Sequence, residues 1–253
     1  MATLTPKRRS LPGLLKKDGF TPHPFDLENG VRTSGLVAGR DLQTGHAHDR
    51  HATAYFGVAP SVFERLLRRW RRTGPAAPME ETTFIDVGAG MGRAVLLASE
   101  MPFRRVIGVE LHPALVRTAR RNLTTWRKAG RVKTPVRMVQ SDAADFTYPA
   151  GPTVLFLFNP FGAPVMRRLI RALSSSRAQH RAALDILYVN NEQEWVLEQS
   201  KGFARLFSGK MLRSRADAAA DHRILANQPD GEYAFAPHED CSIWRWTGAS
   251  LSS

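Results

Sequence analysis

Short apolar runs rich in β-branched residues alternate with longer helical stretches through the middle of the chain. This alternation constrains the fold most, because strands joined by crossover helices form a parallel sheet with helices on both faces. We expect strands at 83–87, 105–110, 136–140, 153–158 and 184–190. The helices expected between and after them are 92–100, 113–128, 163–174 and 192–201. The sequence therefore predicts a doubly wound α/β fold.

The end of the chain is expected to extend this sheet. Two later runs, 203–208 and 242–247, have the pattern of an antiparallel hairpin at one sheet edge. With them the sheet becomes seven-stranded and mostly parallel. The residues between the two runs, about 211–240, are rich in Ala and Asp and are interpreted as an insertion whose order the sequence does not reveal.

The beginning of the chain has a different character. Residues 1–57 show no sustained period and are rich in Gly, Pro, Thr and His, so we expect an irregular basic N-terminal arm. Residues 61–72 then place apolar side chains at helical spacing, and Ser61 is a suitable cap for this helix. The predicted organisation is thus an arm over 1–57 and one α/β domain over 58–253.

Composition excludes several classes of protein. No apolar run reaches the roughly 18 residues that a membrane span needs, and the basic N-terminus lacks the apolar core of a signal peptide. The single cysteine, Cys241, cannot form an internal disulfide or a cysteine-based zinc site. We therefore expect a cytoplasmic protein that makes no membrane contact and whose fold rests on its hydrophobic core.

Charge is the least specific clue to a partner. Lys and Arg number 36 against 23 Asp and Glu, a net charge of +13. Eight of these basic residues lie between Arg117 and Arg137, a stretch without any acid and with Trp126 as its single aromatic residue. A nucleic-acid or acidic partner is one interpretation, and an Arg-rich composition without functional meaning is the other. The oligomeric state cannot be deduced.

A glycine-rich turn follows the first expected strand and carries the most specific chemical signal. The sequence D-V-G-A-G-M-G runs from Asp86 to Gly92 and leads into a helix. Glycines at alternate positions let a ligand approach the backbone, and the helix N-terminus supplies free N–H groups. A dinucleotide fingerprint would need a third glycine where Arg93 stands, so this spacing fits an S-adenosylmethionine pocket better than a nicotinamide site. The predicted cofactor-binding residues here are Asp86, Gly88, Ala89, Gly90 and Gly92.

Two further acids follow the next strands in the chain. Glu110 ends the second strand, where two carboxylate oxygens suit the hydroxyls of a ribose. Asp142, next to Ala143, follows the third strand and is a candidate partner for an adenine amine. Each acid alone has a simpler interpretation as a solvated loop residue. Together with the glycine turn, Glu110, Asp142 and Ala143 predict the rest of a nucleotide-type site.

The fourth strand delivers Asn159, Pro160 and Phe161 to the same sheet edge. An amide beside a rigid proline and an aromatic ring can orient an acceptor nitrogen, although asparagine cannot act as a base. The chemistry therefore suits an amine that arrives neutral or becomes so. The alternative is a simple turn in which Asn and Pro end the strand.

Together these segments resemble the class I S-adenosylmethionine-dependent methyltransferases over about residues 83–210. The narrower pattern is similar to that of the non-SET lysine methyltransferases of the disruptor-of-telomeric-silencing type and to bacterial proteins of uncharacterised substrate. The resemblance implies N-methylation with S-adenosylmethionine as cofactor. The second proline of the base and glutamine amino-methylases and the doubled asparagine of the lysine enzymes are both missing. The acceptor therefore stays open between a protein side chain or other macromolecule, which we favour, and a small amine.

In the resembling families the preceding segment covers the cofactor, which implies that Tyr55 lines the donor methyl. Packing of Tyr55 into the core is the alternative. Nearby, His46, His48 and His51 are close in sequence but lack a regular scaffold, and methyl transfer from a sulfonium needs no metal, so we predict none. Asn159, Pro160, Phe161 and Tyr55 are thus the predicted catalytic residues, with Asn159 also near the cofactor. Competing predictions are a basic nucleic-acid-binding protein and, less favoured, a nicotinamide oxidoreductase.

Overall fold

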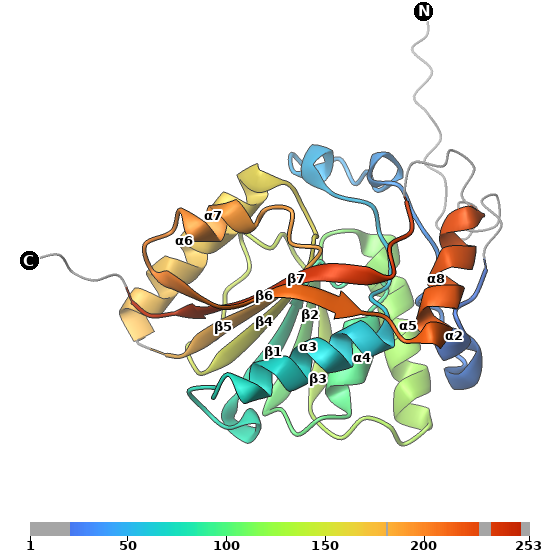
Figure 1. Ribbon diagram of the computed structural model, residues 1–253, viewed down its shortest axis with the longest axis horizontal. Coiled ribbons are helices and arrows are strands. Elements are labelled where there is room, and N and C mark those ends of the chain that lie inside the picture. Colours follow the sequence, from blue (N-terminus) through green and yellow to red (C-terminus); the bar gives the residue numbers. More distant parts are fainter. Residues whose placement is uncertain (1–20, 181, 228–233, 249–253) are drawn as a thin grey trace, which may run out of the picture.

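The computed structural model describes residues 21–180, 182–227 and 234–248. Within these ranges seven strands form one sheet in the order β3-β2-β1-β4-β5-β7-β6 (Figure 1). Strands β1 to β5 pair with one another in parallel. Strand β7 pairs antiparallel with both β5 and β6. The strands are β1 (Thr83–Val87), β2 (Arg105–Glu110), β3 (Val136–Gln140), β4 (Thr153–Phe158), β5 (Leu184–Val189), β6 (Phe203–Leu212) and β7 (His238–Trp246). The predicted mixed seven-stranded α/β fold is confirmed.

The central strands are apolar throughout because both of their faces are covered. Every residue of β1 and β5 is buried. Successive residues of β1 enter different cores: Phe84 contributes to one and Ile85 to the other. This pattern explains why these segments are continuous apolar runs instead of alternating polar and apolar residues.

Five helices cover the two faces of the sheet. The face that includes Phe84 packs against α3 (Pro60–Arg72), α4 (Arg93–Ser99) and α5 (Pro113–Lys128). The opposite face packs against α6 (Ala163–His180) and α7 (Glu194–Glu198). Figure 1 shows α6 and α7 on one side of the strands and α3 and α4 on the other. Because β1, β2, β4 and β5 are parallel, their carboxyl ends lie at the same edge of the sheet. Ligands bind at this edge in such sheets.

Several element boundaries differ from those predicted. Helix α6 continues to His180, past the run of serines where the sequence suggested its end, and α7 is shorter than expected. The helix predicted to start at Ser61 begins instead at Pro60, and the Ser61 hydroxyl accepts a hydrogen bond from the Ser214 backbone N–H at 2.8 Å. Proline suits the first helical position because that position needs no N–H donor.

The segment predicted as an insertion contains a helix in its described part. Helix α8 (Arg215–Ala226) is capped by Ser214, whose side chain accepts from the Asp217 N–H. The Asp217 carboxylate in turn accepts from the Ser61 N–H at 2.8 Å, which fixes α8 to the start of α3. Residues 228–233 lie outside the described residues.

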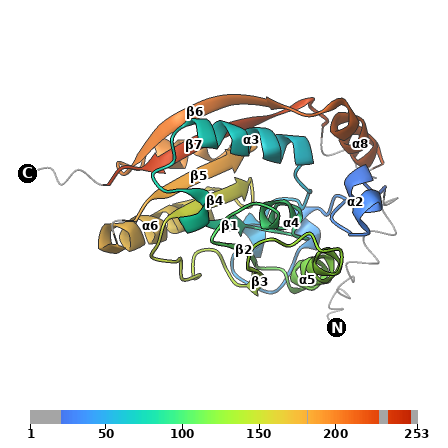
Figure 2. The same ribbon diagram turned by 90° about the horizontal axis from the view of Figure 1, so that it is seen from below.

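The arm is more ordered than the sequence predicted. It contains α2 (Pro24–Asn29) and two short 3-10 helices, 39–41 and 49–51. The Asp26 carboxylate accepts hydrogen bonds from the backbone and hydroxyl groups of Thr33 and Ser34. Figure 2 shows α2 beside α8 and near α5, and the Phe25 and Trp126 ring centroids lie 5.7 Å apart. The basic residues of the arm before position 21 lie outside the described residues. The division into arm and domain stays a prediction.

The contacts of Arg93 explain why the described part of the arm is ordered. Its guanidinium is buried and donates to the Thr33 and Ser34 hydroxyls at 2.7 and 3.0 Å and to the Gly57 carbonyl at 3.0 Å. Asp26 lies 3.8 Å away and balances its charge. A buried arginine needs such partners, because an unpaired buried charge is costly. The residue that breaks the dinucleotide pattern thus attaches the arm to α4.

Within the described ranges, none of the helices combines the length and the apolar character that crossing a bilayer requires.

Candidate active site

The glycine turn after β1 places three backbone positions in the left-handed region. Gly88, Gly90 and Gly92 have φ of 74°, 54° and 88°. A Cβ on Gly88 would lie 2.4 Å from the Pro160 side chain, and one on Gly90 would lie 2.1 Å from the Tyr55 ring. One on Gly92 would meet Ala119 of α5 at 3.2 Å. The first two glycines therefore admit the loop and the arm, while Gly92 serves helix packing.

A cavity opens beside this turn. The predicted residues that line it are Tyr55, Asp86, Gly88, Ala89, Glu110, Asp142, Ala143, Pro160 and Phe161. Gly90, Gly92 and Asn159 are not among its lining residues. We call this space the donor cavity.

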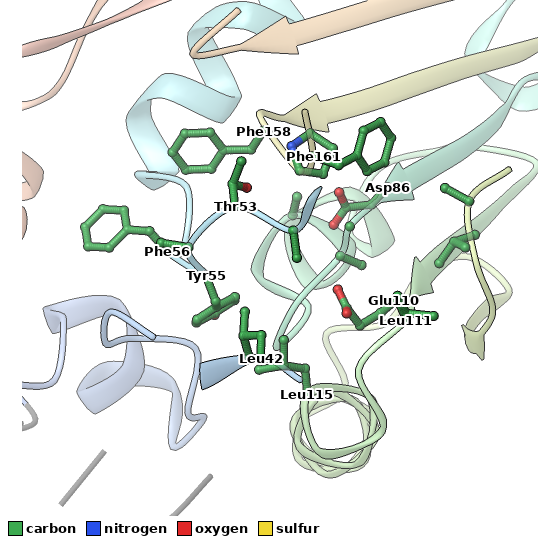
Figure 3. A pocket seen from close by; sticks show the side chains of 18 of the residues that line it. Leu42, Thr53, Tyr55, Phe56, Asp86, Glu110, Leu111, Leu115, Phe158 and Phe161 are labelled. Carbon is green, nitrogen blue, oxygen red and sulfur yellow. The ribbon is translucent and has the colours of Figure 1, made fainter. Parts of the chain in front are cut away.

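Two buried carboxyl groups point into the donor cavity from the ends of β1 and β2 (Figure 3). Burial raises the pKa of Asp86 to about 8, with the charge of Glu110 adding to the effect. Burial also raises the pKa of Glu110, although backbone N–H groups oppose the shift. The Gly90 N–H donates to Glu110 Oε2 at 2.9 Å and the His112 N–H donates to Oε1 at 2.7 Å. The two carboxylate oxygens together offer about four lone pairs, so the group can still accept from a ligand hydroxyl.

Tyr55 lines the donor cavity with its ring but not with an available hydroxyl. Its backbone forms a bridge with Val37, and its hydroxyl donates to the Thr33 carbonyl at 2.6 Å. Burial raises the pKa of Tyr55 well above its usual value. The Tyr55 ring lies against Gly90 and helps to shape the cavity, and its hydroxyl proton is engaged by the arm. A catalytic role of Tyr55 stays a prediction.

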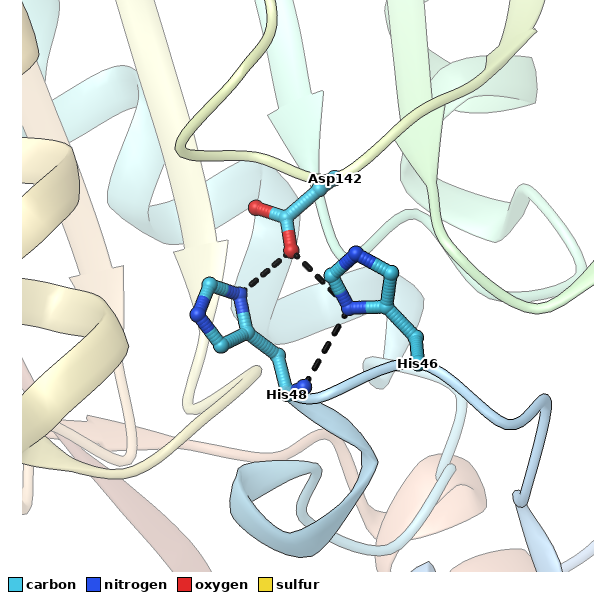
Figure 4. A group of neighbouring side chains, drawn as sticks. All are labelled: His46, His48 and Asp142. Carbon is cyan, nitrogen blue, oxygen red and sulfur yellow. Dashed lines mark hydrogen bonds and ion pairs between the residues drawn. The ribbon is translucent and has the colours of Figure 1, made fainter.

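Asp142 contacts the histidine segment of the arm (Figure 4). His48 Nδ1 lies 2.5 Å from Asp142 Oδ2, and Arg168 donates to His48 Nε2 at 2.8 Å. Because arginine can only donate, His48 Nε2 accepts and Nδ1 carries the proton toward Asp142. The other oxygen, Oδ1, accepts from the Ala144 N–H at 2.6 Å. The arm thus closes the donor cavity at the position predicted for adenine.

His46 completes a cluster whose geometry resembles a metal site. Ligand atoms of His46, His48 and Asp142 all lie within 4.8 Å of one another. His46 Nδ1 accepts from the His48 N–H at 3.2 Å, however, and His48 Nδ1 is hydrogen-bonded to Asp142. Each of the three residues therefore already has an atom engaged in these hydrogen bonds. The absence of a metal stays a prediction.

The loop after β4 contributes residues to two cavities. Pro160 and Phe161 line the donor cavity, whereas Asn159 lines a second cavity. The Asn159 N–H donates to the Val189 carbonyl at 3.1 Å, and the Thr53 hydroxyl donates to the Asn159 carbonyl. The Asn159 side-chain Oδ1 is buried and has no hydrogen-bond partner. Asn159 therefore lines the second cavity, and its predicted place near the cofactor stays a prediction.

The sequence did not indicate several of the residues around the two cavities. His48, Phe56 and Phe158 line the donor cavity, and Asn190 lines the second one. His48 reaches Asp142 across 94 residues, so no local pattern could reveal it. Asn190 could have been found, because it directly follows β5, just as Asn159 directly follows the neighbouring strand β4. Treating all strand ends alike would have identified it.

With this sheet order and this edge, the chain has the class I methyltransferase fold. The solved structure of the [4+2]-cyclase SpnF aligns with 93% of this chain and 93% of its own, at a TM-score of 0.55 and 14% identity. A methyltransferase from Thiobacillus denitrificans, solved with S-adenosyl-L-homocysteine, covers 75% of this chain and 92% of its own at a TM-score of 0.44 and 14% identity.

Sequence comparison finds a curated relative. A 4-amino-L-phenylalanine/4-methylamino-L-phenylalanine methyltransferase from Streptomyces pristinaespiralis is 30% identical over 214 residues. The alignment includes 77% of this chain, and it spans 63% of that protein's length. No protein-family model matches the chain. The narrower resemblance to the non-SET lysine methyltransferases is not confirmed and stays a prediction.

Proposed function

We propose that this protein is an S-adenosylmethionine-dependent methyltransferase that methylates the nitrogen of a small amine. The observation that carries the proposal is the donor cavity, where the glycine turn meets the carboxyl groups of Asp86 and Glu110 at one sheet edge. Fold alone would not suffice, since the SpnF structure is described as a cyclase. The similarity to a named methyltransferase adds independent support.

The residues of the cavity fit the donor molecule in charge and hydrogen bonding. In this proposal the free lone pairs of Glu110 accept from the ribose hydroxyls, and Asp142 and Ala143 adjoin the adenine. Asp86 faces the cationic end of the donor, whose positive charge favours the ionised carboxylate. When bound, the sulfonium supplies an electrophilic methyl group. The chain itself contributes binding, orientation and the exclusion of water.

A small acceptor now replaces the macromolecular one that the sequence favoured. The curated relative is named for a methylated amino acid, and an amino acid is a small amine. The arm, which contacts the Asn159 loop through Thr53, also covers the approach to the donor cavity. Asn159 can orient an acceptor nitrogen but cannot remove its proton. The nitrogen must therefore arrive neutral.

Calorimetric titration with S-adenosylmethionine tests the first half of this proposal. We expect saturable binding to the wild type and at least tenfold weaker binding to Glu110→Gln, because a charge-assisted hydrogen bond contributes about 1.5–3 kcal/mol. Glu28→Gln, an exposed change on α2, is the matched control and should bind like the wild type. Absence of saturable binding to the wild type would refute the proposal, as would saturable binding of a nicotinamide dinucleotide in its place.

Transfer of a tritiated methyl group into a fractionated cell extract tests the second half. We expect the label in the fraction of low molecular weight. Label that accumulates in protein or nucleic acid would contradict the small-amine acceptor while leaving the methyltransferase assignment intact.

A further inference from the structure

A second cavity lies next to the donor cavity and has the larger volume. Its volume is about 640 Å³, against about 120 Å³ for the donor cavity. Both cavities are lined by Ala52, Thr53, Ala54, Phe56 and Phe158. The two spaces therefore lie side by side at these residues, and a molecule in the second cavity would adjoin one in the first.

Two asparagines at neighbouring strand ends line the second cavity. Phe158 of β4 pairs with Val189 of β5, so Asn159 and Asn190 follow directly at the same edge. Their φ values are 36° and 47°, and they are the only non-glycine residues with positive φ in the described part of the chain. Asparagine tolerates this conformation, yet the conformation is strained for a non-glycine residue, and such residues cluster at functional sites.

The side chain of Asn159 lacks the partner that a buried amide needs. Its Oδ1 is buried, and the residue is 7% exposed. A buried acceptor without a donor loses its hydrogen bond to water and gains none in return, so native structures rarely leave one unpaired. An N–H donor from a molecule in the second cavity would satisfy it.

Two arginines, Arg40 and Arg213, and two acids, Glu192 and Glu239, line the second cavity, so their formal charges cancel. The Arg213 guanidinium donates to Asp221 at 2.9 Å, to the His238 carbonyl at 2.9 Å and to Glu239. The exposed Glu192 accepts from Asn190 Nδ2 at 3.3 Å. Charge therefore does not select an anion, and Asn159 Oδ1 offers an acceptor to a ligand that donates hydrogen bonds.

Aromatic surface supplies the rest of the lining. Phe56 and Phe158 are only partly buried, and Figure 3 shows them with Thr53 on the side of the donor cavity opposite Asp86 and Glu110. Because both phenyl rings line the second cavity as well, they offer stacking to a flat ligand there.

We propose that the second cavity is the acceptor site and that it takes an aromatic amine whose nitrogen donates to Asn159 Oδ1 and whose ring packs on Phe56 and Phe158. This inference rests on the proposed methyltransferase function. An aromatic amine is neutral at pH 7 because its ring delocalises the nitrogen lone pair, so it needs no base beside Asn159. As the nitrogen lone pair bonds the methyl carbon, the carbon–sulfur electrons remain on sulfur. The nitrogen becomes cationic and releases its proton to water at the open mouth.

The predicted insertion then has a function. Leu225 of α8 and Ala236 and Glu239 next to or within β7 line the far side of this cavity. The hydrogen bonds of Arg213 join these segments into a rigid wall. Segments that lie far apart in the sequence therefore determine the shape of the acceptor site.

The test titrates the protein, saturated with S-adenosylhomocysteine, with a panel of 4-substituted anilines and the matching cyclohexylamines. We expect anilines to bind at least tenfold more tightly than their saturated counterparts. Phe56→Leu and Phe158→Leu should remove most of this preference. Phe207→Leu, a change to a partly buried phenylalanine on β6 that packs against the core, is the matched control and should keep it. Equal binding of both series, or equal losses in all three variants, would overturn the aromatic acceptor.

Asn159→Gly tests the amide separately. Glycine adopts the same backbone conformation without strain, so the variant should fold, lose methyl transfer by about 100-fold and bind S-adenosylmethionine as the wild type does. Unchanged transfer would refute the role of Asn159. If the wild type does not bind S-adenosylmethionine, the proposed methyltransferase function is refuted. Failure of the acceptor site and failure of the proposed function are therefore distinguishable.

Discussion

The donor side of the sheet edge differs from the acceptor side in how its polar groups are satisfied. At the ends of β1 and β2, both oxygens of Glu110 hold backbone N–H groups, one of them from Gly90 only 20 residues away. At the ends of β4 and β5, Asn159 Oδ1 has no partner and two asparagines have positive φ. The carboxyl group at the end of β2 is therefore already paired before any ligand binds. On the proposed acceptor side, a buried amide oxygen is left for a ligand.

The arm connects these two sides, and Arg93 is its anchor. Arg93→Met should remove the buried hydrogen bonds to Thr33, Ser34 and Gly57 and leave Asp26 unbalanced, at a cost of about 3–5 kcal/mol. The free energy of unfolding from urea titration measures this loss. Arg68→Met, at an exposed position of α3, is the control and should change stability by less than about 0.5 kcal/mol. Equal losses in the two variants would show that the arm does not depend on Arg93.

Alanine substitutions at two glycines distinguish a steric clash with Tyr55 from the strain of a positive φ. Gly90→Ala would place a Cβ 2.1 Å from the Tyr55 ring, whereas Gly74→Ala has a similar φ, 64°, with nothing within 4 Å. We expect a loss of about 3 kcal/mol and of donor binding for the first, and about 1 kcal/mol with intact binding for the second. Thermal unfolding and donor titration give both values. Similar effects of the two changes would mean that the contact between arm and turn is not tight.

The buried carboxyl of Asp86 makes stability depend on pH. Its pKa is raised to about 8 in the folded protein against 3.8 in the unfolded chain, so unfolding releases its proton between these values. Stability from this group is full below pH 4 and is lost as the pH rises toward 8, by up to about 1.4 kcal/mol per pH unit. Unfolding titrations of wild type and Asp86→Asn from pH 5 to 7 should therefore show a steeper decline in the wild type.

The exposed Asp41→Asn serves as the control and should keep the wild-type slope. A cationic donor favours the ionised form of Asp86, so donor affinity should rise with pH over the same range. A wild-type slope that matches that of Asp86→Asn would contradict the raised pKa.

The parallel part of the fold could be predicted from the sequence because its signals are local. Strands β1 to β4 coincide with the predicted ranges, since each is a short apolar run bounded by turn residues. The arm could not be predicted, because its order comes from contacts such as that between Asp26 and Arg93, 67 positions apart in the chain. Helix α8 was missed for a similar reason, since it is tied to the start of α3 by Asp217 and Ser61.

The candidate site divides in the same way. The sequence by itself determined the glycine turn, Glu110 and the Asn159 loop, because each stands at the end of an apolar strand and all such ends meet at one edge. Only the tertiary structure decided that His48 contacts Asp142, that Tyr55 packs against Gly90, and that Asn159 faces a second cavity. Local patterns fix which residues reach the edge, whereas long-range packing fixes which of them face one another. Charge and composition determine neither, because a net charge carries no position.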